Sequence, residues 1–310
     1  MRAHKSVGDV PHGTIESGFP INWIKAAGHL AVWAVMYAIG VALMLGELLG
    51  FPLGWEALLY VALCSHAGYL FDRLKFRDSD LDPADLLADP DRHGFLRSRS
   101  GWIRVLMVLE WIAAMVVGLL LSTWLSVLVV GGVVVGYVYS GWPPSDRARL
   151  KDVSGLKAWL VSIAVVGLGC AALLAQVDLF GGIDSLLSTL SERQSMCILG
   201  MLLVVCGDAV LCDLDDSASD RVYRTRSLPV MVGDRWSALS AVGLLVVGSG
   251  VILLGLVGGD LLVGGVWFVG LVLLSGVVIL VAGPMIGGRR DWVDGRMLIA
   301  ALVAMEIISR

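Results

Sequence analysis

Three aspartates in the last third of a strongly apolar chain have the spacing of a metal site. Asp213, Asp216 and Asp220 belong to the run CDLDDSASDRVYRTRSLPV, residues 212–230, which follows an apolar segment. On a helix that turns 100° per residue, the three carboxylates fall within one narrow arc. Carboxylates this close repel one another unless cations lie between them, and hard oxygen ligands suit Mg²⁺, which also bridges to phosphate oxygens. The run therefore predicts a magnesium site.

Further charges surround this face. Three arginines follow the aspartates, at positions Arg221, Arg224 and Arg226. Such a cluster can pair with the acids or hold an anionic substrate, so acid and base together indicate a metal and a diphosphate. Asp215 points to another face of the helix. Asp208 lies deeper in the apolar segment, where an ionisable group is expected to be functional, and we expect it to pair with a lysine or arginine elsewhere.

A second acidic patch, residues 66–92, closes another apolar segment. Asp72 ends that segment beside Arg73 and Lys75, and a loop rich in aspartates follows. An acidic loop by itself is commonly solvent-facing. Its position opposite the first patch favours a functional role for Asp72.

The composition places the chain in a membrane. Hydrophobic residues make up 57% and charged residues 16%, and the mean hydropathy is +0.82, far from the averages of soluble proteins. A bilayer core of roughly 30 Å needs about 20 apolar residues per helix. We therefore predict an all-α polytopic membrane protein with about nine transmembrane helices. The expected segments are 23–49, 53–72, 102–121, 124–140, 156–176, 195–213, 237–257, 261–283 and 295–309.

Charge placement predicts the organisation of the chain. The polar residues 1–22 are expected to form a cytoplasmic N-terminal segment without a cleaved signal peptide, and 23–310 a single domain. Acidic patches near Asp72 and Asp213 are each followed by a basic loop and two further spans, which indicates two pseudo-repeated four-helix units and a ninth helix.

The lysines and arginines predict the orientation. Of the 23 in the chain, 21 lie in alternate polar segments: 1–25, 73–104, 147–157, 221–235 and 289–296. The positive-inside rule places the N-terminus and these loops in the cytoplasm and, with an odd number of spans, the C-terminus outside the plasma membrane. The basic residues are divided among loops without a nucleic-acid-binding motif, so we expect no nucleic-acid partner.

The aspartate run resembles a known motif. Residues 213–230 are similar to the second aspartate-rich motif of UbiA-type intramembrane prenyltransferases, DxxDxxxDRxxGxRTLPV. The loop of that family with tyrosine-serine, proline-proline and arginine-leucine-lysine pairs resembles Tyr139-Ser140, Pro143-Pro144 and Arg149-Leu150-Lys151. The GLK at 155–157 resembles a segment that opens the fifth helix in some members. The resemblance covers nearly the whole chain and implies nine helices with cytoplasmic active-site loops.

The first motif of the family, NDxxDxxxD, matches less well. With its central aspartate on Asp72, Gly68 stands where the asparagine belongs and Phe76 where the last aspartate belongs. Replacement ligands would come from the carboxylates of the following loop or from polar side chains near Gly68. These candidates are Asp78, Asp80, Asp82, His66 and Tyr69.

The resemblance implies an enzyme of isoprenoid biosynthesis that uses Mg²⁺ to ionise a prenyl diphosphate. The prenyl group would pass to a membrane-soluble acceptor: an aromatic compound, a quinone precursor or a lipid. The implied catalytic metal ligands are Asp72, Asp213, Asp216 and Asp220, with Asp78 as an alternative carboxylate. The implied diphosphate-binding residues are Arg73, Lys75, Lys151, Arg226 and Tyr139. The aromatic faces of Tyr139 and Trp142 could stabilise an allylic cation.

Two alternatives stay open at this point. In a terpene cyclase of the same superfamily, the cation would be attacked by its own double bonds, without an acceptor. A transporter or scaffold would instead bind an anion through the basic loops, and Asp208 and the many glycines suit a transporter. A transporter site is expected near the bilayer midplane, whereas these acids gather at one face, which favours chemistry on a head group.

Overall fold

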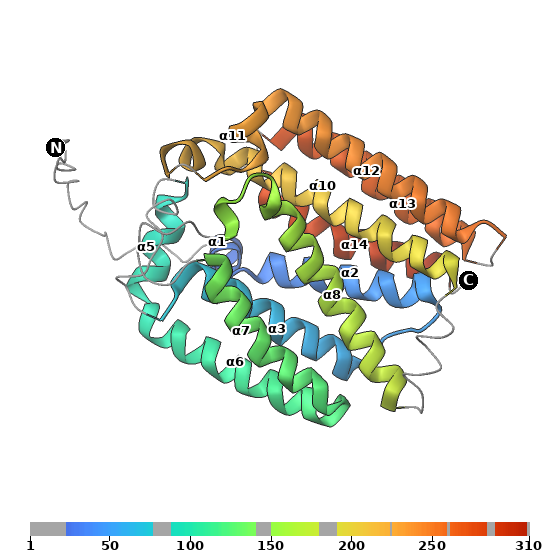
Figure 1. The fold of residues 1–310 in the computed structure, drawn as a ribbon, viewed down its shortest axis with the longest axis horizontal. Helices are drawn as coiled ribbons and strands as arrows, with labels where there is room; N and C mark the ends of the chain where they lie inside the picture. Colours follow the sequence, from blue (N-terminus) through green and yellow to red (C-terminus); the bar gives the residue numbers. More distant parts are fainter. Residues whose placement is uncertain are drawn as a thin grey trace.

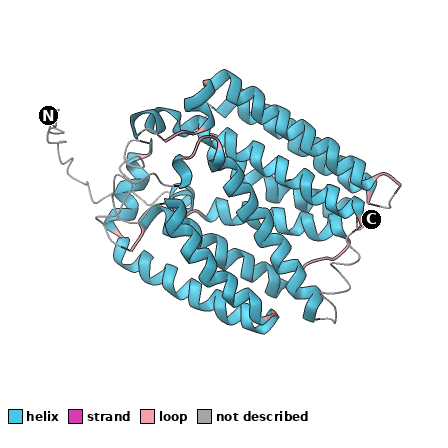
Figure 2. Ribbon diagram, viewed as in Figure 1, coloured by secondary structure: helices cyan, strands magenta, loops and turns pink. Residues whose placement is uncertain are grey.

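A computed structural model describes residues 23–76, 88–140, 150–179, 191–223, 225–258, 261–283 and 289–308. Every regular element in these ranges is a helix (Figure 2). The elements are α1 (Trp23–His29), α2 (Val32–Leu49), α3 (Trp55–Leu74), α5 (Pro90–Ser98), α6 (Ser100–Leu121), α7 (Thr123–Ser140), the 3-10 helix η2 (Leu150–Asp152), α8 (Leu156–Leu179), α10 (Glu192–Tyr223), α11 (Leu228–Val232), α12 (Asp234–Leu256), α13 (Leu262–Ala282) and α14 (Arg290–Ile308).

The long helices lie side by side, and the short helices α1, α5 and α11 gather at one end of the bundle (Figure 1). Within the described ranges, each of the nine expected segments contains a helix. Six helices in these ranges are long and apolar enough to cross a membrane, namely α2, α6, α8, α10, α12 and α13, and α7 is a shorter apolar helix. The all-helical membrane fold is confirmed, and the count of nine spans stays a prediction.

The two halves of the bundle repeat one pattern of neighbours. In the first half α3 packs between α2 and α6, and α7 packs on α6. In the second half α10 packs between α8 and α12, and α13 packs on α12. The last helix, α14, closes the bundle against α2 and α13. This is the arrangement that a duplicated four-helix unit with one added helix would give.

Helices α10 and α12 approach so closely that their backbones touch. A Cβ atom added to Gly200 would lie 2.6 Å from the carbonyl oxygen of Gly248, and one added to Gly248 would lie 2.7 Å from that of Gly200. Apolar side chains gain little from association inside a lipid bilayer, so small residues that allow close van der Waals packing hold membrane helices together. This crossing fixes the helix that carries the aspartates.

The first expected span is interrupted near its start. Ala31 adopts a left-handed conformation with φ of 61°, which separates α1 from α2. The Leu30 carbonyl oxygen at the break lies 2.7 Å from Nε2 of His66, and Nδ1 of the same ring lies 2.6 Å from the Glu110 carboxylate. A polar group at this depth needs such a partner. His66, a candidate replacement ligand, is therefore engaged in holding the helix break.

Asp208 has the partner that the sequence led us to expect. Its carboxylate pairs with Arg296 of α14 and accepts a hydrogen bond of 2.8 Å from the Tyr37 hydroxyl of α2. Arg296 also donates to the Val272 carbonyl oxygen on α13 at 3.1 Å. A buried charge is tolerated when it is paired and hydrogen-bonded. Asp208 thus connects four helices inside the bundle.

Candidate functional site

The three aspartates of the second motif surround one ammonium group. Nζ of Lys157, in the first turn of α8, lies 2.6 Å from Asp213, 3.8 Å from Asp216 and 3.7 Å from Asp220. Asp213 and Asp220 are buried, with 4% and 6% of their surface exposed. Helix α10 runs on past the expected end of its span, to Tyr223, so all three carboxylates lie on one helical face. The ammonium offsets part of the repulsion between them.

A docked loop places Lys157 over the aspartates. The Thr225 hydroxyl donates to the Asp152 carboxylate at 3.1 Å. The Gly155 N–H donates to the Arg226 carbonyl oxygen at 3.2 Å, and Gly155 has a φ of 68°, a left-handed conformation that glycine adopts without steric cost. These bonds tie the segment before α8 to the segment after α10. The start of α8 is therefore held next to the end of α10.

The start of α14 binds the other side of α10. Arg290 donates to Asp216 at 2.5 Å, and Arg289 donates to Asp215 at 2.7 Å. The Arg289 N–H also donates to Asp215 at 2.5 Å, so this carboxylate satisfies a free N–H group at the helix start. The Asp216 carboxylate raises the pKa of the Arg290 guanidinium well above its ordinary value, because its negative charge stabilises the charged form of the arginine.

In the first motif, Lys75 binds the aspartate of the same motif, Asp72. Nζ of Lys75, a side chain only 5% exposed, donates to the carbonyl oxygen of Asp72 at 2.5 Å and to its carboxylate at 3.2 Å. The Arg73 guanidinium lies 5.4 Å from the centre of the Tyr69 ring, within the range of a cation–π contact. Asp72 keeps about a third of its side-chain surface exposed. Its carboxylate is accessible from the charged end of the bundle.

Tyr139 lies within electrostatic range of residues from both aspartate motifs. On α7, this side chain interacts electrostatically with Asp72 and Arg73 of α3 and with Lys157 and Asp213 on the other side. The Asp216 carboxylate is in turn within electrostatic range of Arg73. Asp72 and Asp213, about 140 residues apart in sequence, are therefore both within electrostatic range of the same side chain.

Comparison with solved structures decides the fold. A UbiA homologue from Aeropyrum pernix K1, solved in its apo form, matches 89% of this chain and 98% of its own, with a TM-score of 0.65 and 14% sequence identity. The chain has the UbiA fold. At this identity the likeness concerns the fold alone. The sequence matches no protein-family model and no curated protein.

Within the UbiA fold, several predicted residues lie away from the carboxylate cluster. Arg226 is exposed, and it contributes its carbonyl oxygen to the docked loop. Arg221 pairs with Asp234 at 2.9 Å on an exposed surface. The backbone of Lys151 is in η2, but its side chain lies outside the described residues. Asp78 and Trp142 lie wholly outside them.

Two cations of the cluster were missed from the sequence. In the sequence, Lys157 stands out only as part of the GLK segment at 155–157, and Arg290 only as one charge of a basic segment. The signal for Lys157 was its position at the first turn of an apolar helix, on the same expected side of the membrane as the aspartates. Nothing in the spacing around Arg290 indicated Asp216 as its partner.

The donor set fits Mg²⁺ in its chemistry. Three carboxylates within reach of one cation position are the hard oxygen ligands that Mg²⁺ takes, and Arg290 and Lys157 leave the cluster with an excess of one negative charge. In the structure the Lys157 ammonium lies between them, and the described residues contain no group of three or more ligands in metal-binding geometry. Asp213, Asp216 and Asp220 could hold the ion once the ammonium moves aside.

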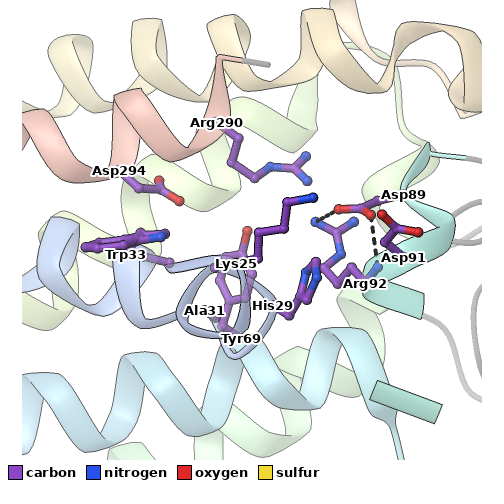
Figure 3. Close-up of a pocket in the computed structure, with 12 residues that line it drawn as sticks. Lys25, His29, Ala31, Trp33, Tyr69, Asp89, Asp91, Arg92, Arg290 and Asp294 are labelled. Atoms are coloured by element: carbon purple, nitrogen blue, oxygen red, sulfur yellow. Dashed lines mark hydrogen bonds and ion pairs between the residues drawn. The ribbon is translucent and has the colours of Figure 1, made fainter. Parts of the chain in front are cut away.

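Two cavities adjoin the cluster. One of about 70 Å³ is lined by Lys157 and Asp213 on its polar side and by apolar groups such as Val210 and Leu244 elsewhere. The other, of about 210 Å³, lies among α1, α2, α3, α5 and α14 and shares Arg290 with the cluster (Figure 3). The carboxylates therefore lie between an apolar space and a charged one.

Proposed function

We propose that this protein is a Mg²⁺-dependent intramembrane prenyltransferase that cleaves an allylic prenyl diphosphate and transfers the prenyl group to a lipophilic acceptor. The observation that carries the proposal is the convergence of Asp213, Asp216 and Asp220 on one cation position, next to an apolar cavity, in a UbiA fold. The site would face the cytoplasm, because Lys157 and Arg290, which belong to the basic segments expected there, lie at the site.

The residues of the site would act on the leaving group. When bound, Mg²⁺ supplies positive charge that stabilises the departing pyrophosphate. Asp213, Asp216 and Asp220 would hold the ion, with Asp72 facing them from α3. Lys157, released from the aspartates, would bind diphosphate oxygens, and Arg73, within electrostatic range of Asp216, would be a second candidate for this role.

The reaction breaks the bond between the allylic carbon and the diphosphate oxygen. The electron pair leaves with pyrophosphate, and the acceptor supplies a pair for the new bond and releases a proton to water. Val210 and Leu244 line the small cavity beside Lys157, which has room for a few carbon atoms at the reacting end of the chain. Exclusion of water there would protect the allylic cation, and the Tyr139 ring, within electrostatic range of Asp72 and Asp213, would supply an aromatic face to stabilise it.

The test is pyrophosphate release by the detergent-purified protein from ten-, fifteen- and twenty-carbon allylic diphosphates. We expect release with Mg²⁺ and none with EDTA, and a prenylated product once an extract of membrane lipids is added. A cyclic hydrocarbon or alcohol formed without an acceptor would indicate a terpene cyclase instead. Absence of release under all these conditions would contradict catalysis on an allylic diphosphate.

A further inference from the structure

The larger cavity has a charged lining that prenyl-diphosphate chemistry does not use. It measures about 210 Å³, below the roughly 300 Å³ at which pockets for drug-sized ligands begin, so it fits a head group better than a whole lipid. Its walls come from the end of the bundle where α1 and α5 lie (Figure 1). Three lysines or arginines and three aspartates line it. They are Lys25, Arg92, Arg290, Asp89, Asp91 and Asp294.

Three cations from three different helices approach one part of this cavity. Lys25 of α1, Arg92 of α5 and Arg290 of α14 direct their charged ends toward the same region (Figure 3). Arg92 is held in place by Asp89, whose carboxylate accepts from the Arg92 N–H at 3.0 Å and lies 3.7 Å from its guanidinium. Cations arriving from several directions suit the tetrahedral oxygens of a phosphate better than the two coplanar oxygens of a carboxylate.

The other side of the cavity has the opposite character. Asp294 of α14 and Trp33 of α2 both line this cavity, and both are drawn on the side away from Asp89 and Asp91 (Figure 3). A carboxylate and a tryptophan ring that line the same part of a cavity can recognise an ammonium group, through a charged hydrogen bond and a cation–π contact. The cavity therefore has three cations on one side, two of them paired with Asp89 and Asp216, and Asp294 with Trp33 on the other side.

We propose that this cavity binds the head group of the acceptor, and that this head group is an aminoalkyl phosphate. Lys25, Arg92 and Arg290 bind the phosphate, and Asp294 with Trp33 binds the amine. The equal numbers of lysine or arginine and aspartate side chains match a zwitterion better than a net anion or a hydrocarbon. The acceptor role rests on the proposed function. It follows from Arg290, which lines the cavity and also binds Asp216 of the carboxylate cluster.

Native mass spectrometry of the full-length protein in detergent tests the head-group site. The probes are phosphatidylethanolamine and phosphatidylglycerol with identical acyl chains, added as an equimolar mixture. We expect preferential retention of phosphatidylethanolamine. The preference should fall about tenfold in Asp294→Asn, because a charged hydrogen bond to the amine is lost. Lys25→Gln should weaken retention of both lipids, since both carry the phosphate.

Matched variants control for charge and folding. Glu306→Gln removes a carboxylate from an exposed position of the same helix, and Arg97→Gln removes an exposed cation from α5, so both should keep the parent preference. If Asp294→Asn fails to fold, Trp33→Leu tests the same amine end. Soluble O-phosphoethanolamine distinguishes a free head group from a lipid as the ligand. If it displaces phosphatidylethanolamine, the free head group suffices for binding. If it does not, the ligand must be a lipid.

Two results would overturn the head-group site. They are equal retention of the two lipids by the parent protein, and an unchanged preference in both Asp294→Asn and Trp33→Leu. Binding is read without turnover, so such results leave diphosphate cleavage untouched. Retained phosphatidylethanolamine in a protein that cleaves no allylic diphosphate would instead support the site and remove its role in prenyl transfer.

Discussion

Nζ of Lys157 lies 2.6 Å from the Asp213 carboxylate, which joins the first turn of α8 to the last turns of α10. Asp216 and Asp220 lie within 4 Å of the same ammonium. The lysine therefore takes the position that a divalent cation would need. We infer that Mg²⁺ and Lys157 compete for these carboxylates, and that Lys157 turns toward the diphosphate when the ion is bound.

Removal of the ammonium should change how the protein responds to Mg²⁺. In Lys157→Met, three clustered carboxylates lose their shared counter-charge, so we expect a lower Tm without Mg²⁺. Added Mg²⁺ should then raise Tm by more than it does in the parent, because the ion no longer displaces a bound lysine. Thermal unfolding in detergent across a Mg²⁺ titration measures both effects. Arg221→Gln, which removes an exposed cation near the same helix end, should behave as the parent. If Mg²⁺ raises the Tm of Lys157→Met by the same amount as that of the parent, Lys157 and Mg²⁺ do not compete for the carboxylates.

Two adjacent aspartates on α10 should differ in their roles. Asp216 faces Lys157, whereas Asp215 binds Arg289 and the start of α14. Asp216→Asn should lower Mg²⁺-dependent pyrophosphate release by at least about 100-fold, because stabilisation of the leaving group is lost. Asp215→Asn should lower Tm while the protein that remains folded keeps most of its activity. If Asp215→Asn loses activity and Asp216→Asn loses only stability, the metal site has been assigned to the wrong face of α10.

The buried pair between Asp208 and Arg296 should matter for stability. Arg296→Met leaves the Asp208 carboxylate buried beside Tyr37 without its cation, which we expect to cost about 3–5 kcal/mol. The double variant Asp208→Leu with Arg296→Met removes both charges and should recover part of that loss. Chemical unfolding in mixed micelles compares the three proteins. If the double variant has a free energy of unfolding no higher than that of Arg296→Met, the loss of stability comes from packing and not from the unpaired charge.

The crossing of α10 and α12 should be intolerant of larger residues. Gly248→Leu places a side chain against the backbone of Gly200, and overpacking of this kind costs about 1–3 kcal/mol. Gly243→Leu is the matched control on the same helix, since a Cβ there meets no atom within 4 Å. Thermal unfolding of both variants is the measurement. Equal Tm values would mean that the helices can move apart without loss.

Helix positions were predictable because the bilayer imposes a simple rule on the sequence. A span needs a long apolar run, and the segments around 102–121 and 237–257 have one. The orientation of Asp213, Asp216 and Asp220 on one face follows from helical periodicity alone. The break at Ala31 was not predicted, because it depends on His66, a residue of the next helix, binding the Leu30 carbonyl oxygen.

Partners from distant helices could not be read from the sequence. Lys157 and Asp213 are 56 residues apart, and Arg290 and Asp216 are 74 apart, so tertiary packing alone brings them together. Local spacing indicates the charge of a site but not which of several cytoplasmic cations will reach it. The same holds for Arg296, one of 23 lysines and arginines that could have neutralised Asp208.

The most direct test of the central claim is a structure of the protein with Mn²⁺ and an unreactive thiodiphosphate analogue of an allylic substrate. Mn²⁺ takes the same oxygen ligands as Mg²⁺, and its anomalous scattering locates it independently of the protein atoms. We predict an anomalous peak bound by carboxylate oxygens of Asp213 and Asp216, with the Lys157 ammonium moved from Asp213 onto the diphosphate. A bound analogue with no peak at these carboxylates, and with Lys157 still on Asp213, would contradict the account.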